Sequence, residues 1–382
     1  MAKHALLSAS GAHRWLECTP SALLELQFPQ STSEYAEEGT AAHELCELTA
    51  RYFLGEVSEM DFENRRDELA KGPYYNAEMQ ECAEGYAAYI MELYETAKQN
   101  CTTTEIMLEQ RVDVSEYIPE CFGTADCIIV ADGTMTISDY KHGMGIKVEA
   151  TDNPQLKTYA LGTLAMFDFL YDINTVRLII YQPRLENVDE WEISVAELLE
   201  WAEHTLKPTA QLAYNGEGEF CAGSHCRFCK AKAVCRKRAE QNLLLAQYEF
   251  APPDNLEEHE IPIILSKASE LVTWANDVKE YALAQALSGV HYDGYKLVEG
   301  RSVRKYIDKD AAAKAVTDAG YDPYGAPEIM GITAMEKLLG KKKFAEILSG
   351  YVEKPKGAPT LVPETDKRPV YSDANEDFKE EQ

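Results

Sequence analysis

Residues 122–141 read FGTADCIIVADGTMTISDYK, two apolar runs that flank Asp132-Gly133. An Asp-Gly pair between alternating apolar residues predicts a β-hairpin, because both turn positions favour positive φ. A two-residue turn there sets the pairing of the strands, with the partners Ala131–Thr134, Val130–Met135 and Ile128–Ile137. Further out, Asp126 then faces Asp139, and Lys141 lies on the same face as Asp139.

The outer end of this hairpin carries two opposed carboxylates, Asp126 and Asp139, at the edge of an apolar face. Directly opposed residues have Cβ atoms roughly 4.5–5.5 Å apart, and like charges there are destabilising. A bound divalent cation would remove this cost, and oxygen ligands suit Mg²⁺ or Mn²⁺. The alternative is a pair of solvent-exposed aspartates, which a one-residue shift of register would separate.

Length and composition set the class of protein. The chain has 382 residues, enough for two or three domains, and 45% of them are hydrophobic. No run approaches the roughly 18 apolar residues of a membrane span, and the N-terminal segment has no clear cleavage site. These features predict a cytoplasmic protein. A net charge of -28 argues against non-specific binding to nucleic acid, but it leaves a local site open.

A second motif is a cluster of cysteines. Cys226, Cys229 and Cys235 form C-x2-C-x5-C, a spacing that indicates a metal centre in a cytosolic protein. The spacing leaves the fourth ligand open between Cys221 and Cys18, and the metal open between zinc and an iron–sulfur cluster. A segment without metal is the further alternative. The remaining cysteines are expected to be reduced thiols: Cys46, Cys82, Cys101, Cys121 and Cys127.

The cysteine segment is also rich in cations within an acidic chain. They either compensate the charge of the thiolates or contact phosphate, and the two roles are compatible. The cations are Arg227, Lys230, Lys232, Arg236, Lys237 and Arg238.

The flanking sequence predicts an α/β fold. Strands are expected at 106–114, which carries Glu109, and at 175–183, followed by a capping box at Ser194–Glu197. Helices are expected at 33–54, with His43 near the first turns, at 74–99 and at 151–171. In the last of these, Gln155 and Tyr159 lie one turn apart on one face. Apolar residues at helical spacing should face the core: Leu156, Ala160, Leu164, Phe167 and Leu170. The order predicts a mixed central sheet flanked by helices.

Taken together, these motifs resemble the PD-(D/E)XK nuclease superfamily, and more closely its RecB-like branch. The resemblance is closest to a phage and prophage family of stand-alone RecB-like nucleases. EGTAAH resembles the branch's Gly-x-x-x-His element, FGTAD its G-x-x-D strand, SDYK its (D/E)-x-K strand and QLKTY its Q-x-x-x-Y helix. The resemblance covers residues 8–240 and implies a restriction-endonuclease-like core.

The resemblance implies roles for individual residues. His43, Asp126, Asp139 and Glu109 would bind Mg²⁺ or Mn²⁺, and Tyr140 could add its backbone carbonyl. Lys141 would orient water or stabilise negative charge, and Gln155 and Tyr159 would position the DNA backbone. The branch's iron–sulfur variant, with one cysteine before the core and three after it, selects Cys18 with Cys226, Cys229 and Cys235 as ligands of a [4Fe-4S] cluster.

The function implied is that of a deoxyribonuclease, an exonuclease acting on single-stranded DNA or duplex ends in phage recombination or replication. It would be encoded by a phage or prophage and act in the bacterial cytoplasm, with a phage single-strand-binding or annealing protein as a further partner. The alternatives are a non-catalytic DNA-binding recombination accessory protein and a zinc-stabilised structural protein. The opposed carboxylates favour the enzyme.

Four parts are expected along the chain: an N-terminal helical part at 1–105, the nuclease core with the cysteines at 106–245, an α+β module at 246–353 and an extended tail at 354–382. The module should hold one or two amphipathic helices at 257–287, a strand or hairpin near 294–307, and helices at 309–319 and 332–349. Its exposed cations would bind DNA or a partner, or simply be solvated; they are Arg301, Arg304, Lys305, Lys341, Lys342 and Lys343.

Overall fold

A computed structural model describes residues 5–29, 33–167, 169–244 and 260–295. The chain divides into two units, Met1–Ala282 and Leu283–Gln382, and the sheet and both candidate sites lie in the first. The predicted strand near 294–307, the helices at 309–319 and 332–349 and the tail from 354 lie outside the described residues, apart from Gly294 and Tyr295. Within the described part, no helix is both long and apolar enough to cross a membrane.

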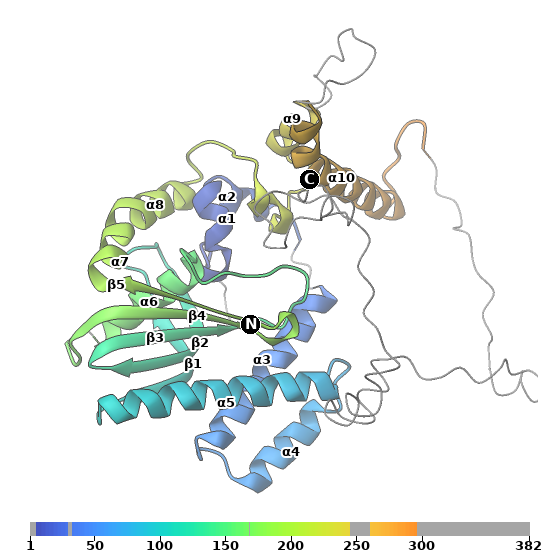
Figure 1. Cartoon of the computed structure of the whole chain (residues 1–382). Coiled ribbons are helices and arrows are strands. Elements are labelled where there is room, and N and C mark those ends of the chain that lie inside the picture. The colour runs from blue at the N-terminus through green and yellow to red at the C-terminus, as the bar shows by residue number, and fades with distance from the viewer. Residues whose placement is uncertain (1–4, 30–32, 168, 245–259, 296–382) are drawn as a thin grey trace, which may run out of the picture. The chain divides into compact units, whose positions relative to one another are not determined.

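The centre of the fold is a mixed five-stranded sheet in the order β1-β2-β3-β4-β5 (Figure 1). The strands are β1 (Glu105–Asp113), β2 (Phe122–Ala131), β3 (Gly133–Tyr140), β4 (Ile173–Gln182) and β5 (Asn187–Ser194). Neighbouring strands are antiparallel except for β3 and β4, which are parallel. The parallel pair needs a crossover, and α6 (Pro154–Phe167) supplies it. The predicted α/β class and mixed sheet are therefore confirmed.

The β2–β3 hairpin has the predicted register. Ala131 pairs with Thr134, and the ladder continues to Cys127 and Ser138. The prediction for the turn was wrong in one respect: Gly133 has a positive φ of 88°, whereas Asp132 does not. Asp132 is instead engaged through its side chain, which accepts a hydrogen bond from the Asp172 backbone N–H at 3.3 Å.

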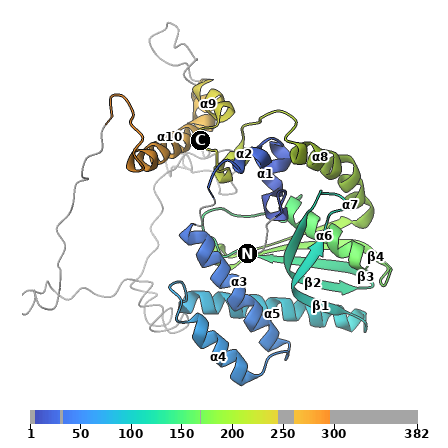
Figure 2. The ribbon, with the colours of Figure 1, turned by 180° about the vertical axis from the view of Figure 1, so that it is seen from behind.

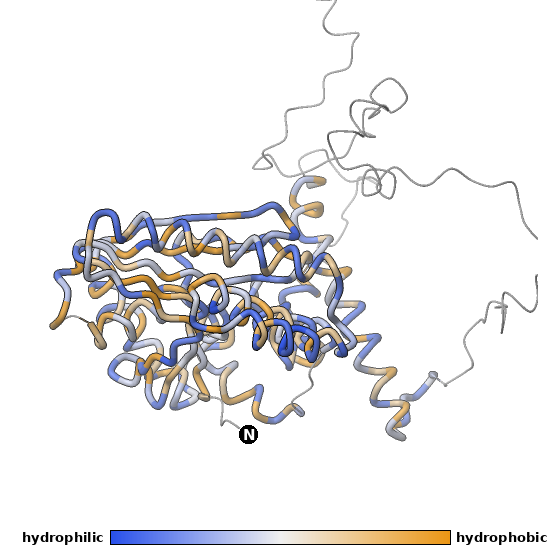
Figure 3. Tube along the Cα trace, turned by 90° about the horizontal axis from the view of Figure 1, so that it is seen from below, coloured by the Kyte–Doolittle hydropathy of each residue, from blue (hydrophilic) through white to orange (hydrophobic). Residues whose placement is uncertain are grey.

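Helices cover both faces of the sheet, and each face has its own apolar core. On one face, α6 packs with α1 (Ala12–Glu17), α7 (Val195–Trp201) and α8 (Lys207–Asn215) around Ile128, Ile137 and their neighbours. On the other face, α3 (Glu34–Phe53) and α5 (Ala77–Asn100) pack on Cys127, Ile129 and Tyr140. The short α4 (Glu59–Leu69) lies beside α3 (Figure 2). Apolar residues recur along the strands between these layers (Figure 3).

The helix boundaries follow local capping signals. Ser33 caps α3, Asn76 caps α5, and Ser194 with Glu197 forms the predicted capping box of α7. Two predictions need correction. His43 lies in the middle of α3 and not near its first turns, because about two and a half turns of helix separate it from Glu34. Leu170 lies beyond the end of α6 and is 63% exposed, whereas the other predicted core positions of that helix are buried.

The remaining described helices frame the cysteine segment. They are α2 (Ser21–Glu25), α9 (Arg236–Leu243) and α10 (Glu260–Leu287), with a short 3-10 helix at Ser224–Phe228. The prediction of one or two helices at 257–287 thus resolves to a single long helix. The helices α1, α2, α4 and α9, and a π-helical turn at Ala202–Leu206, were not predicted.

Candidate functional site

Three predicted ligands meet at the open end of the β2–β3 hairpin. His43 comes from α3, Glu109 from β1 and Asp126 from β2, and one ligand atom of each lies within 4.8 Å of the others. His43 Nδ1 is 3.3 Å from Asp126 Oδ1 and 4.0 Å from Glu109 Oε1. All three side chains are partly exposed, so an ion could reach them from solvent.

A strained backbone brings Glu109 into this group. Its φ is 48°, a left-handed value that is rare for a residue with a side chain, and it lies inside a strand. Leu108 and Val112 are four residues apart, so in a regular strand their side chains would lie on the same face. They pack into opposite cores instead, so the alternation of β1 reverses around Glu109. The reversal turns the carboxylate towards α3, away from the regular pleat.

Asp139 lies outside this group of three and takes part in a second one. Its Oδ2 is 2.7 Å from Lys141 Nζ, and its Oδ1 accepts a hydrogen bond from Gln155 Nε2 at 2.9 Å. Lys141 also donates to Gln155 Oε1 at 3.1 Å, and Gln155 Nε2 is 3.2 Å from the hydroxyl of Tyr159. The predicted residues Asp139, Lys141, Gln155 and Tyr159 therefore form one connected polar chain.

The prediction that Asp126 and Asp139 are ligands of the same metal ion is thus only partly matched by the geometry. The hairpin ladder opens beyond Cys127–Ser138, and Asp126 Oδ2 accepts a hydrogen bond of 2.7 Å from the Tyr140 backbone N–H. Asp139 is almost fully buried, and its Oδ2 contacts Lys141 without a well-directed hydrogen bond from any described residue. A buried carboxylate oxygen held mainly by charge is available to a further cation.

The charges of the two groups influence one another. Burial raises the pKa of Glu109 to about 7, with a further contribution from Asp126. Burial opposes the charge of His43, but the hydrogen bond and charge of Asp126 outweigh it and raise the pKa to about 9. Burial also raises the pKa of Asp139, while Lys141 acts in the opposite direction. The surplus of carboxylates at the hairpin mouth therefore favours bound cations.

The glycine of FGTAD has a packing role beside this site. A Cβ at Gly123 would lie only 2.6 Å from a ring carbon of Tyr159. Glycine therefore allows the tyrosine ring to lie flat against β2, where its hydroxyl reaches Gln155.

A further polar chain behind the metal ligands was missed by sequence reasoning. Tyr140 packs edge-on against the His43 ring, and its hydroxyl is 2.8 Å from His142 Nδ1. His142 Nε2 is 3.5 Å from Glu38, which pairs with Arg184 at 3.1 Å. The available signal was SDYKH itself, because Tyr140 and His142 alternate with Asp139 and Lys141 and so face α3.

The loop after Lys141 is anchored by a buried glutamine. Gln182 Nε2 donates to the carbonyls of Gly143 and Ile146 at 2.7 and 2.8 Å, and its Oε1 accepts from the Val148 N–H at 3.1 Å. Gln182 is 1% exposed, whereas Met144 and Ile146 of the loop are exposed. One side chain at the end of β4 thus holds the loop that follows the candidate catalytic lysine.

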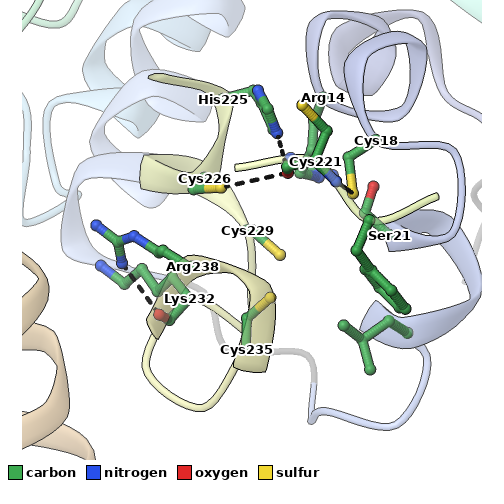
Figure 4. A pocket seen from close by; sticks show the side chains of 12 residues that line it. Arg14, Cys18, Ser21, Cys221, His225, Cys226, Cys229, Lys232, Cys235 and Arg238 are labelled. Atoms are coloured by element: carbon green, nitrogen blue, oxygen red, sulfur yellow. Dashed lines mark hydrogen bonds between the residues drawn. The ribbon is translucent and has the colours of Figure 1, made fainter. Parts of the chain in front are cut away.

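The predicted cluster ligands line one pocket. Cys18, at the end of α1, faces Cys226, Cys229 and Cys235 across it, and Cys221 lies at its edge (Figure 4). The Cys221 N–H donates to Cys18 Sγ and the Gly223 N–H to Cys226 Sγ, each at 3.5 Å. The segment after the core therefore meets the N-terminal segment at this pocket.

Other contacts join the same two segments. Arg14 pairs with Glu25 at 2.8 Å, and Glu25 also accepts the Lys230 N–H at 2.7 Å. The hydroxyl of Thr19 donates to the Glu217 carbonyl at 2.6 Å. The pocket is thus organised by hydrogen bonds as well as by its thiols.

The thiols of this pocket are more widely spaced than the ligands at the hairpin mouth. Among the described His, Cys, Asp and Glu residues, no three ligand atoms of the pocket lie within 4.8 Å of one another. Burial raises the pKa of the Cys229 thiol to about 12. The other five cysteines are free thiols, as predicted, and four of them are buried.

Two comparisons with known proteins bear on this chain. A solved structure titled "Crystal structure of SSO0001" is 15% identical in sequence, covers 57% of this chain and 94% of its own, and superposes with a TM-score of 0.22. A similarity at this level carries no argument about fold or function. A family model described as "Protein of unknown function (DUF2800)" matches residues 4–369, nearly the whole chain, and the chain therefore belongs to that family.

Proposed function

We propose that this chain is a metal-dependent deoxyribonuclease of the PD-(D/E)XK type, similar to the RecB-like exonucleases. The observation that carries the proposal is the meeting of two groups at one hairpin mouth. One is a potential ion site of His43, Glu109 and Asp126. The other is the chain of Asp139, Lys141, Gln155 and Tyr159.

The residues fit a divalent cation. Carboxylate oxygens and one imidazole converge within a few ångströms, and this is a donor set that suits a divalent cation. Bound Mg²⁺ or Mn²⁺ would lower the pKa of a water molecule and polarise the scissile phosphate. His43, Glu109 and Asp126 would hold the ion, and Asp139 Oδ2 lies on the adjacent strand as a further ligand.

The second group would act on the substrate. Lys141 is partly buried, and the charges of Asp139 and Asp126 raise its pKa against the effect of burial, so it stays protonated. A fixed ammonium group beside the ion stabilises negative charge on a phosphate in the transition state. Gln155 holds both Asp139 and Lys141, so it keeps the lysine aimed at the hairpin mouth. Tyr159 supports Gln155 from below.

The cysteine pocket fits a metal centre with thiolate ligands. Four cysteines around one pocket, one before the core and three after it, support a [4Fe-4S] cluster with Cys18, Cys226, Cys229 and Cys235 as ligands. Bound there, the cluster would be a structural link between the N-terminal segment and the segment after the core.

The test is digestion of end-labelled single-stranded and duplex DNA with Mg²⁺ or Mn²⁺. Wild type should degrade the DNA, and Lys141→Ala should lose at least 100-fold in rate, the scale of a missing transition-state donor. Lys147→Ala is the matched control, because this lysine lies in the following loop and is exposed. A folded wild type that binds DNA but leaves it intact with either metal would instead support a non-catalytic DNA-binding accessory protein.

A further inference from the structure

The segment from Phe220 to Ala239 differs from the rest of this acidic chain. It contains six lysines and arginines and no aspartate or glutamate, in a protein of net charge -28. Not all six charges are available. Arg238 is buried against Asp277 and Glu270, and Lys232 is 2.7 Å from Asp277.

Four cations are left on the surface. Arg227, Lys230, Arg236 and Lys237 are exposed, and none of them forms an ion pair with another described residue. Acidic residues of α10 thus neutralise Arg238 and Lys232, which have a structural role. The other four cations face solvent. Four cations without an ion-pair partner among the described residues give this part of an acidic chain a local positive charge, which favours an anionic ligand.

An aromatic side chain lies among these cations. Phe228 is 62% exposed, although it lies between the buried residues Cys226 and Cys229. Two hydrogen bonds hold its backbone in place. The Phe228 carbonyl accepts a hydrogen bond from the Arg14 side chain at 3.4 Å, and the backbone N–H of Lys230 donates to the Glu25 carboxylate. The ring therefore projects from a fixed turn, with a cation on either side in Arg227 and Lys230.

We infer that Arg227, Phe228, Lys230, Arg236 and Lys237 form a binding surface for single-stranded nucleic acid. Cations that follow a phosphate backbone, combined with an exposed ring on which a base can stack, are the shared features of such surfaces. A duplex would satisfy the cations but would offer Phe228 no unstacked base. The inference rests on the proposed function and deepens it, because it names the cysteine segment as the place that holds a single strand.

The experiment measures binding separately from cleavage. Full-length protein is titrated into a fluorescent single-stranded oligothymidine without added divalent cation, and fluorescence anisotropy is followed at several salt concentrations. Phe228→Ala should weaken binding about 5- to 100-fold, the effect of losing one stacked base. Phe228→Trp should restore it, which a purely structural role of the ring would not explain.

Charge is tested with a matched pair of double variants. Arg227→Ala/Lys230→Ala should reduce the slope of log K against log salt by about 1.4, because each phosphate contact on a single strand contributes about 0.7. Arg65→Ala/Lys71→Ala removes the same charge from exposed positions in and after α4 and should leave the slope unchanged. Phe169→Ala is the control for the ring, since Phe169 is exposed at the opposite end of the sheet.

Three results would overturn the inference: wild-type affinity in both surface variants, equal losses in the surface and control variants, or a loss confined to blunt duplex. Thermal denaturation checks that each variant is folded. The two proposals can fail separately. Metal-dependent digestion with unchanged binding in the variants would reject only this surface, and weakened binding without digestion by wild type would reject only the nuclease.

Discussion

At the scale of single residues, the candidate site depends on one unfavourable backbone conformation. Glu109 has a left-handed φ inside β1, and this reverses the alternation of the strand so that its carboxylate joins His43 and Asp126. Such strain is maintained only where the surrounding structure enforces it, and it is concentrated at functional sites. Tyr140 contributes twice, since its N–H holds Asp126 and its ring packs against His43.

Comparison of Glu109→Gly with Glu109→Gln tests this strain. Both variants remove the carboxylate and should weaken binding of Mn²⁺, but glycine also tolerates positive φ. We expect the free energy of unfolding of the glycine variant to exceed that of the glutamine variant by about 1 kcal/mol in urea denaturation. Glu120, with a φ of 55° outside the site, is the control: the same pair of substitutions there should show the stability difference without any change in metal binding. A glycine variant less stable than the glutamine variant would contradict the assignment of strain.

At the scale of elements, the site is assembled at the ends of elements that are far apart in sequence. The end of β4 holds the loop after Lys141 through Gln182, and α6 supplies Gln155, which donates to Asp139 at the end of β3. The cysteine segment is tied on one side to α1 and α2 and on the other to α10. Buried polar side chains that satisfy several backbone groups at once fix such junctions.

Gln182→Leu should release the loop. The substitution leaves the carbonyls of Gly143 and Ile146 and the N–H of Val148 without their partner. We expect a loss of about 2 kcal/mol in the free energy of unfolding, because each unsatisfied group costs about 1–3 kcal/mol and the exposed loop can recover part of this from water. Hydrogen exchange should show faster exchange of the Val148 amide. Gln211→Leu, on the surface of α8, should change neither quantity.

The ion pairs of Asp277 with Lys232 and Arg238 stabilise the fold by an amount that depends on pH. Burial disfavours the charge of Asp277, but Lys232 and Arg238 outweigh this effect and hold its pKa below the usual 3.8. The folded-state pKa is therefore lower than the unfolded one, so the carboxylate stabilises the fold above about pH 4 and loses this effect as the pH falls through the folded-state value. The pKa of Arg238 is raised by Asp277 and Glu270 against the effect of burial, so it stays charged, and Glu270 is the other acid that faces it.

Asp277→Asn should accordingly lower the free energy of unfolding at pH 7 by about 3 kcal/mol, because it leaves Arg238 buried without its closest counter-charge. The difference from wild type should shrink as the pH is lowered from 5 to 3 in urea denaturation. Glu270→Gln is the matched control: Glu270 contacts the same arginine from an exposed position and should matter less. A difference that is constant with pH would show that the carboxylate charge is not the cause.

At the scale of the whole molecule, the cysteine pocket brings together Cys18 and Cys226, which are more than half the chain apart. A metal centre bound there would close this loop and stabilise the fold by about 2–5 kcal/mol, as a disulfide does. The net charge of -28 repels nucleic acid from the surface of the molecule, except at local basic surfaces. Because salt screens this repulsion as well as the local attraction, salt concentration should change the affinity for DNA that we propose.

Cys18→Ala and Cys221→Ala separate the two candidates for the fourth ligand. Protein purified without oxygen should be brown and contain about four iron and four sulfide per chain. Cys18→Ala should lose the colour and lower the melting temperature, whereas Cys221→Ala should keep both. Colourless wild type with one equivalent of zinc would contradict the cluster, and loss of colour in Cys221→Ala alone would move the fourth ligand to that residue.

The sequence by itself determined the mixed sheet, the hairpin register and the capping box of α7, because these depend on alternation, turn chemistry and helix caps that act over a few positions. It did not reveal that Glu109 reverses the pleat, that Asp139 pairs with Lys141 apart from Asp126, or that His142 and Gln182 stand behind the site. Only the tertiary structure decided these points. Each depends on which buried polar groups meet across elements far apart in the chain, and the cost of leaving such groups unpaired is felt only when the whole core has formed.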